Sequence, residues 1–215
     1  MNEKYEVQNI IKFWNKFRNK KIHLFGRKYR FLINIRNGTL PHLLGLQYIN
    51  SNSSKLIGLD LYNYIKNNNL SDDKIYALIN KNNPTKLMFV KKRIETFISF
   101  WENIENSYIV EKTTQFSHIK SKLLLVQSNK SSFLQLGLKQ INNKKYVLET
   151  YFVELDDKYF SNSKSMDKVI EIEETTNKGI SKPFSFKNEK QVLANVLNKQ
   201  KMKNRNGKIM INILM

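Results

Sequence analysis

The 215-residue sequence contains no cysteine, only three prolines and only three histidines. The absence of cysteine excludes disulfides and cysteine-ligated zinc, and three histidines leave little room for other transition-metal sites. Long apolar runs are also missing, so the sequence offers neither a membrane span nor an apolar leader with a small-residue cleavage site. No Gly-rich nucleotide loop is present, and we expect no cofactor. We therefore expect a cytoplasmic protein without a membrane partner.

Acidic residues are scarce, because 18 Asp and Glu residues stand against 37 Lys and Arg residues, which gives a net charge of +19. The excess is uneven, with +8 on residues 1–50, +7 on 51–150, −3 on 151–180 and +7 on 181–215. A basic chain with one acidic block fits a polyanionic ligand, with RNA or DNA as the leading candidates. The alternative is that the Asn, Lys and Ile content reflects an AT-rich genome.

The stretch from Lys120 to Asp157 holds three apolar runs separated by short breaks rich in Asn, Ser and Lys. The runs are Leu123 to Val126, Phe133 to Leu138 and Tyr146 to Leu155. This pattern is typical of strands joined by hairpin turns, and it predicts a three-stranded antiparallel meander. In a regular third strand, Glu149 and Tyr151 would face one side and Thr150 the other.

Helices are predicted before the meander, where apolar residues recur at helical spacing. They cover residues 4–20, 55–66, 74–80 and 85–106, and strand structure is expected at 22–36. The basic helix at 4–20 would suit a membrane or nucleic-acid surface, although packing on its own domain is the commoner use.

After the meander, the sequence predicts a short strand at 169–172, a basic helix at 188–203 and a final strand at 208–215. Together these elements place N-terminal helices and a strand before the three-stranded antiparallel meander. We expect one domain at residues 1–180 and a basic C-terminal helix and tail at 181–215.

Three motifs resemble phage-associated nuclease domains. They are PHLLGL at 41–46, LLLVQSNKSSFLQLGLK at 123–139 and ETYF at 149–152. These are the PBECR-type domains, related to the barnase, EndoU, colicin and RelE-like superfamily, and the resemblance covers roughly residues 20–160. It implies a BECR-like α+β fold, with N-terminal helices and a strand packed on an antiparallel meander sheet of about four strands. It also implies metal-independent RNA cleavage, often as a toxin.

His42 is the best candidate for proton transfer. Cleaving RNA without a metal needs a base for the ribose 2′-hydroxyl, an acid for the leaving oxygen and cations for the phosphate. An imidazole exchanges protons near neutral pH, and His42 follows Pro41 in a short helix or turn that Gly45 closes. The alternative is that His42 merely fixes this turn by hydrogen bonding, but the family resemblance favours catalysis. His23 and His118 are weaker candidates.

Thr150 and Lys139 complete the predicted catalytic set. Thr150 matches the place where the resembling domains carry a hydroxyl on a late strand, although threonine is also an ordinary strand former. Its neighbour Glu149 can share a site with it only if a bulge interrupts the strand, so we favour Thr150. Lys139 would hold a phosphate of the RNA. The alternative interpretation is that Lys139 is simply a solvent-exposed residue at the end of a strand.

Other basic and aromatic residues are candidates for RNA binding, because cations hold the backbone and rings stack on bases. They are Lys28, Arg30, Tyr48, Lys120, Lys122 and Tyr151. The alternative for the tyrosines is that they are half-buried and pack against the protein's own side chains instead of stacking on bases. No His and carboxylate pattern with metal-ligand spacing occurs, and no metal ligand is predicted.

The leading hypothesis is a metal-independent endoribonuclease of toxin or phage-defence type that cuts RNA by general acid/base chemistry. One alternative is a nucleic-acid-binding module without catalysis, and another is a partner-binding, phage-related protein. A toxin also needs an inhibitor, and an acidic antitoxin protein or an RNA antitoxin would suit a cationic groove.

Overall fold

The computed structural model describes residues 6–51, 55–114, 119–142, 145–176 and 179–187. The chain divides into two units, Met1–Phe184 and Ser185–Met215, and every element below belongs to the first. The helix expected at 188–203 and the strand expected at 208–215 lie outside the described residues. The division expected at residue 181 stays a prediction.

Five α-helices occur in the described part of the chain. They are α1 (Val7–Asn15), α2 (Leu40–Leu44), α3 (Gly58–Asn67), α4 (Asp72–Asn82) and α5 (Leu87–Glu102). All four predicted helices are confirmed, with somewhat different bounds. Helix α4 begins where the Ser71 hydroxyl accepts a hydrogen bond from the Lys74 N–H at 3.4 Å. Acidic residues in its first turn favour the same start, because they face the positive end of the helix dipole.

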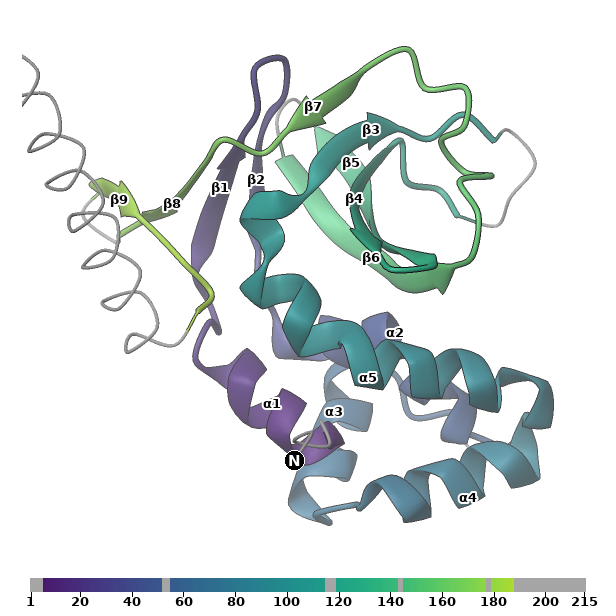
Figure 1. Cartoon of the computed structure of the whole chain (residues 1–215). Helices are drawn as coiled ribbons and strands as arrows, with labels where there is room; N and C mark the ends of the chain where they lie inside the picture. Colours follow the sequence, from purple (N-terminus) through teal and green to yellow (C-terminus); the bar gives the residue numbers. More distant parts are fainter. Residues whose placement is uncertain (1–5, 52–54, 115–118, 143–144, 177–178, 188–215) are drawn as a thin grey trace, which may run out of the picture. The chain divides into compact units, whose positions relative to one another are not determined.

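The sheet contains nine strands within the described residues. They are β1 (Lys21–Phe25), β2 (Arg30–Asn34), β3 (Tyr108–Glu111), β4 (Leu123–Asn129), β5 (Ser132–Asn142), β6 (Lys145–Glu154), β7 (Met166–Lys168), β8 (Glu171–Thr175) and β9 (Ser181–Pro183). Their order across the sheet is β7-β3-β4-β5-β6-β2-β1-β8-β9. The sheet curls through β3 to β6 and continues into the long β1–β2 hairpin (Figure 1).

The fold class is α+β as predicted, but the expectation of about four antiparallel strands is wrong. The β4-β5-β6 meander is confirmed. Strand β2 then joins its free edge in parallel, with Leu32 opposite Lys145 and Ile33 opposite Tyr146. Residues 151–180, which carry the net charge of −3, include β8, which pairs with β1. Such pairings between distant segments leave no local pattern in the sequence, which is why the sequence predicts too small a sheet.

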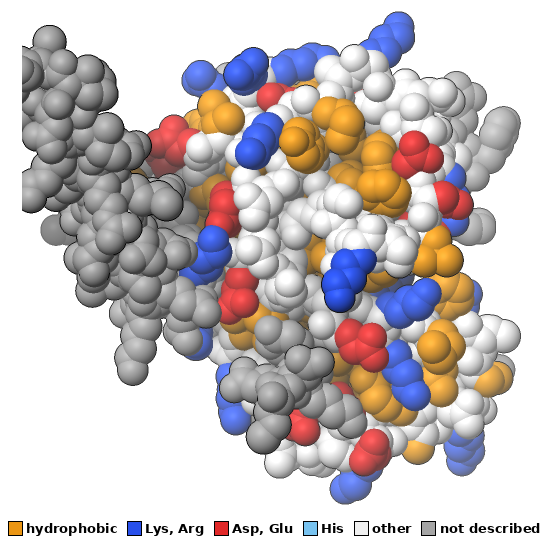
Figure 2. All heavy atoms as spheres, viewed as in Figure 1, with side chains coloured by type: hydrophobic (Ala, Val, Ile, Leu, Met, Phe, Trp, Pro, Cys, Tyr) orange, Lys and Arg blue, Asp and Glu red, His pale blue; other side chains and the backbone are white. Residues whose placement is uncertain are grey.

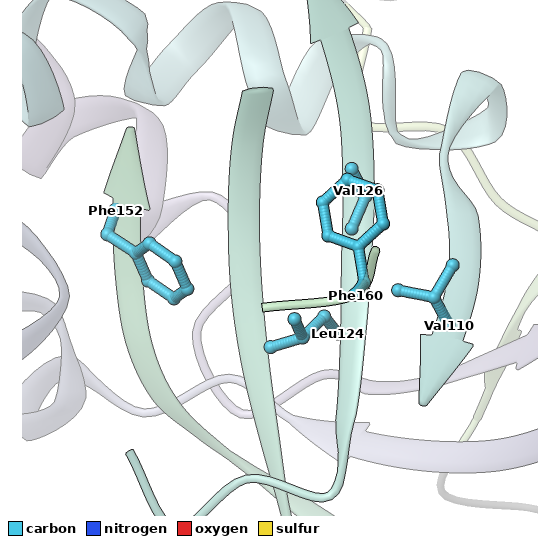
Figure 3. Packing of buried hydrophobic residues seen from close by; sticks show 5 residues of the cluster. All are labelled: Val110, Leu124, Val126, Phe152 and Phe160. Carbon is cyan, nitrogen blue, oxygen red and sulfur yellow. The ribbon is translucent and has the colours of Figure 1, made fainter. Parts of the chain in front are cut away.

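Two apolar layers cover the two faces of the curled sheet. On one face, the Tyr151 ring lies 5.5 Å from Phe97 and 5.2 Å from Phe100 of α5, centroid to centroid. On the other face, a smaller core forms around side chains from β3, β4, β6 and the segment after β6 (Figure 3). Its members are Val110, Leu124, Val126, Phe152 and Phe160. Full burial of each such side chain is worth about 1.5–3 kcal/mol.

Candidate active site

His42 is held at the surface by a short helix that packs against β6. Pro41 stands in the first turn of α2, where its fixed φ favours a helix start. Gly45 ends the helix at a φ of +77°, a conformation that glycine adopts without strain. A Cβ at Gly45 would lie 3.3 Å from Arg93 Nη1, so the turn closes directly against α5. The neighbours Pro41, Leu43 and Leu44 are buried, whereas His42 is exposed.

A β-bulge at Glu149 changes the predicted arrangement of β6. Gly137 of β5 lies opposite Thr150, but the next residue, Leu138, lies opposite Leu148, so Glu149 has no partner across the strand pair. An extra residue of this kind re-aims side chains, and such bulges are frequent beside active sites. The bulge therefore meets the condition under which Glu149 and Thr150 can share a site, and the preference for Thr150 stays a prediction.

The Glu149 carboxylate is held by the segment that leads into β4. The Lys120 N–H donates to Glu149 Oε1 at 3.0 Å, and the Ser121 hydroxyl donates to Glu149 Oε2. Ser121 Oγ would lie 2.5 Å from a Cβ at Gly137, and Thr150 Cγ2 would lie 3.0 Å from it. Glu149, Ser121 and Thr150 therefore meet on one face of the sheet, above a position that only glycine can occupy.

The charges of Arg93 and Glu149 act on His42 in opposite directions. Burial by surrounding protein atoms lowers the pKa of His42, Arg93 lowers it further, and Glu149 acts in the opposite direction. Although part of the ring reaches solvent, the lowered pKa keeps the imidazole neutral at physiological pH. A neutral imidazole beside a carboxylate can accept a proton and then have its new charge stabilised.

A cavity of about 210 Å³ opens beside these groups. Thr150 and Arg93 line it together with Tyr48, Lys86 and Phe89. The Lys86 Nζ lies 5.8 Å from the ring centroids of both Tyr48 and Phe89. Arg93 also donates to the Leu43 carbonyl at 3.4 Å, which ties α5 to α2. The cavity therefore combines cations, a hydroxyl and aromatic surface beside Arg93, whereas His42 and Glu149 are not among the described residues that line it.

Comparison with known protein families decides which class of protein this is. A family model described as phage-Barnase-EndoU-ColicinE5/D-RelE like nuclease4, or PBECR4, matches residues 6–192. The chain belongs to the PBECR4 nuclease family. No curated protein and no solved structure matches it. The resemblance predicted from the three motifs is confirmed, and the match supports nuclease function in general.

In the PBECR4 domain, the predicted RNA-binding lysines gather around a second, larger cavity. Lys120 and Lys122 line it, and Lys28 lies beside it through an ion pair with the lining residue Glu111 at 3.5 Å. Figure 2 shows Lys and Arg side chains along the edge where Figure 1 has the β1–β2 hairpin and β7. Lys139 is exposed on β5 opposite Val147 and lines neither cavity.

Two predicted RNA-binding residues lie elsewhere in the PBECR4 domain. Tyr151 is fully buried, and its hydroxyl donates to Thr96 Oγ1 of α5 at 2.8 Å, so it has no surface on which a base could stack. The alternation along β6 places it on the helix-covered face. Arg30 is exposed at the start of β2 and lines neither cavity, and its guanidinium lies 5.9 Å from the Phe25 ring centroid.

Sequence reasoning missed Arg93 and Ser121 of the PBECR4 domain. Arg93 belongs to the Lys-Lys-Arg run of the fifth helix, and nothing local distinguishes it from its neighbours. Ser121 stands between two lysines and is buried, which only the packing over Gly137 explains. The one usable signal was the glycine itself, because an isolated glycine within a strand pattern indicates close approach of another group.

The described residues include no group of three or more His, Asp or Glu side chains arranged to hold a metal ion. Metal independence stays a prediction, and His118 lies outside the described residues. Over the same part of the chain, no helix has the length and apolar character needed to cross a bilayer.

Proposed function

We propose that this PBECR4 domain is a metal-independent endoribonuclease that cleaves single-stranded RNA at the site formed by His42, Glu149 and Arg93. The proposal rests on the bulge at Glu149, whose carboxylate is held by Lys120 and Ser121, and on the opposing charges of Glu149 and Arg93 that act on the His42 imidazole. General acid/base chemistry requires this combination of groups, and the nuclease-family match supports their use on nucleic acid.

His42 is the general base in this proposal. Its imidazole accepts the proton of the ribose 2′-hydroxyl, the 2′-oxygen attacks phosphorus, and the bond from phosphorus to the 5′-oxygen breaks. The 5′-oxygen leaves with a proton from solvent, and the other product ends in a 2′,3′-cyclic phosphate. Glu149 stabilises the imidazolium that forms, since its charge favours protonated His42. The lowered pKa of His42 supports this direction of proton transfer.

Arg93 stabilises the charge that develops on the phosphate in the transition state. Its guanidinium stays protonated even though desolvation lowers its pKa, and Thr150 in the same cavity offers a hydroxyl to a phosphate oxygen. Fixed donors of this kind are worth about 10²–10³ in kcat when they meet developing charge. Lys139 stays a candidate for binding another phosphate further along the RNA strand.

RNA is the proposed substrate because the reaction uses the 2′-hydroxyl, which DNA lacks. The net charge of +19 supports a polyanionic substrate. The toxin or phage-defence role, action in the cytoplasm and inhibition by an acidic protein or an RNA complete the proposal. They are supported by the family description, whose wording includes phage and colicin, and by the net charge of +19.

Incubation of the purified protein with single-stranded RNA in EDTA tests the activity. We expect products with 2′,3′-cyclic phosphate ends and a fall in kcat/KM of about 10²–10⁴ for His42→Ala. His23→Ala is the matched control, because His23 belongs to β1 and stacks with Phe25 away from the site. Intact RNA, or cleavage that survives His42→Ala, overturns the proposal.

Expression in a bacterial host tests the toxin role separately. Growth arrest with the wild-type chain and normal growth with His42→Ala are expected. Normal growth with the wild-type chain at equal protein levels contradicts that role.

A further inference from the structure

The larger cavity has a volume of about 590 Å³ and lies apart from the catalytic cavity, with Ile119 as the one residue that lines both. Its walls come from the residue before β2, from β3 and the segment after it, from the segment entering β4 and the first residue of β4, and from β5 and β6. Lys112, Lys120 and Lys122 line it together with Tyr29 and Tyr146. The proposed cleavage reaction uses none of these side chains.

The charge of this cavity is positive. Lys120 and Lys122 are both exposed, on either side of the buried Ser121. The acidic residue in the wall, Glu111, accepts a hydrogen bond from the Tyr29 hydroxyl and pairs with Lys28, so its charge is compensated locally. A chain of phosphates therefore meets attraction from the lysines and little repulsion from the carboxylate.

The cavity also offers aromatic surface that is held in place. Tyr146 is half-buried on β6, and its ring centroid lies 5.3 Å from that of the buried Phe31. Tyr29 is fixed by its hydrogen bond to Glu111. Lysines along a groove with tyrosine rings between them are the combination that binds single-stranded nucleic acid without sequence preference.

The cavity connects to the catalytic site through the segment that holds Glu149. The Lys120 N–H and the Ser121 hydroxyl bond the two carboxylate oxygens, while the Lys120 and Lys122 side chains line the larger cavity. An RNA strand whose cleaved phosphate lies at His42 would therefore have its flanking nucleotides beside these lysines.

We propose that the larger cavity is a subsite for the single-stranded RNA that flanks the cleaved bond. Lys120 and Lys122 hold its phosphates, and Tyr146 stacks on a base. The subsite rests on the proposed function, since it assigns the cavity to the same substrate. It gives the enzyme a preference for oligonucleotides over dinucleotides.

Binding to a non-cleavable strand tests the subsite without requiring catalysis. The probe is a fluorescein-labelled, 2′-O-methyl oligouridylate of about eight nucleotides, measured by anisotropy against His42→Ala protein over a range of salt concentrations. Adding Lys120→Gln and Lys122→Gln to the His42→Ala protein should weaken binding about tenfold. The slope of log affinity against log salt concentration should become smaller by about 0.7 for each phosphate that is no longer neutralised. Tyr146→Leu, which keeps the apolar packing on Phe31, should weaken binding about tenfold with little change in the slope.

The matched control removes two charges elsewhere. Lys66 of α3 and Lys81 of α4 are exposed and line neither cavity, so Lys66→Gln with Lys81→Gln has the same effect on net charge. If the cavity pair weakens binding no more than this control pair does, the subsite is refuted.

Cleavage assays distinguish the two proposals. In the active protein, the ratio of kcat/KM for an eight-nucleotide RNA over a dinucleotide should fall about tenfold in the Lys120→Gln, Lys122→Gln variant. An unchanged ratio contradicts the subsite while the activity stands. Absence of any cleavage, with the binding difference intact, contradicts the nuclease proposal and leaves the subsite as a binding site for single strands.

Discussion

Ser121 Oγ occupies the space that a side chain on residue 137 would need, 2.5 Å from the position of a Cβ at Gly137. The same hydroxyl donates to Glu149, so a glycine on β5 makes room for the group that holds this carboxylate of the proposed site. The glycine is therefore required by the site, although it supplies no reactive group of its own.

We expect Gly137→Ala to disturb this arrangement. The methyl group must push Ser121 away, which should cost about 1–3 kcal/mol of stability, as overpacking usually does. Displacement of Glu149 by about 1 Å should lower kcat/KM about 10²-fold. Thermal unfolding and RNA cleavage measure the two effects.

Ser121→Gly combined with Gly137→Ala provides the control. The double variant should recover part of the stability, because the clash with Ser121 is gone while Thr150 Cγ2 still lies 3.0 Å from the new Cβ. It should not recover activity, because the hydroxyl that holds Glu149 is also gone. If Gly137→Ala alone cleaves RNA at the wild-type rate, the hydroxyl does not position the carboxylate.

The acid limb of the pH–rate profile should report His42. The base must be neutral, so kcat/KM should rise as pH passes the lowered pKa of His42 and be lost below it. Arg93→Met removes a charge that lowers this pKa, so the midpoint should move to higher pH. Glu149→Gln removes a charge that raises it, so the midpoint should move to lower pH.

Profiles of kcat/KM for the wild type and both variants, recorded at constant ionic strength, measure these shifts. The opposite signs separate an electrostatic effect from a general loss of activity, which would leave the midpoint in place. Midpoints that stay fixed, or move together, would argue against His42 as the base.

Asp167 should stabilise the β1–β2 hairpin that borders the larger cavity. Its carboxylate accepts the backbone N–H groups of Arg27, Lys28 and Tyr29 at 2.8, 2.7 and 2.9 Å. One of its oxygens occupies the place of a Cβ at Gly26, so the loop fits closely around it. Asp167→Asn should lower the free energy of unfolding by about 1–3 kcal/mol, because a carboxylate accepting from backbone N–H groups is stronger than an amide oxygen.

The contribution of Asp167 should depend on pH. Desolvation raises the pKa of Asp167, but the three backbone hydrogen bonds outweigh it, and the net pKa is lowered. Its stabilisation is therefore present above the ordinary pKa of an aspartate and is lost as the pH falls through the lowered value. Melting curves should show the difference between wild type and Asp167→Asn near neutral pH and its disappearance in strong acid.

Tyr151→Phe should affect stability and leave RNA binding unchanged. The hydroxyl is buried and donates to Thr96 Oγ1, which in turn donates to the Lys92 carbonyl at 2.7 Å. Loss of one such bond costs about 1 kcal/mol. Anisotropy with single-stranded RNA checks the second half of the prediction, and weaker binding would restore Tyr151 as an RNA-binding residue.

Much of the local structure could be predicted from the sequence. Apolar spacing predicted α1 and α5, Ser71 predicted the start of α4, and alternation with polar breaks predicted the β4-β5-β6 meander. Each of these signals depends on residues within one or two turns or along one strand. His42 could be singled out in the same way, because few residue types titrate near neutral pH.

The site as an assembly could not be predicted. A bulge of one residue moves Glu149 to the side of Thr150, and simple alternation had grouped it with Tyr151. Arg93 acquires a role only because α5 and α2 close on each other at Gly45.

The sequence by itself determined the helices, the meander, the positive charge and the candidate imidazole, because these follow from neighbouring residues and from composition. The tertiary structure decided the nine-strand order, the parallel pairing of β2 with β6, the burial of Tyr151 and the hydrogen bond from Ser121 to Glu149, whose charge acts on His42. Those features depend on contacts between residues far apart in the chain, and in a strand a register shift of one residue exchanges the buried and exposed faces.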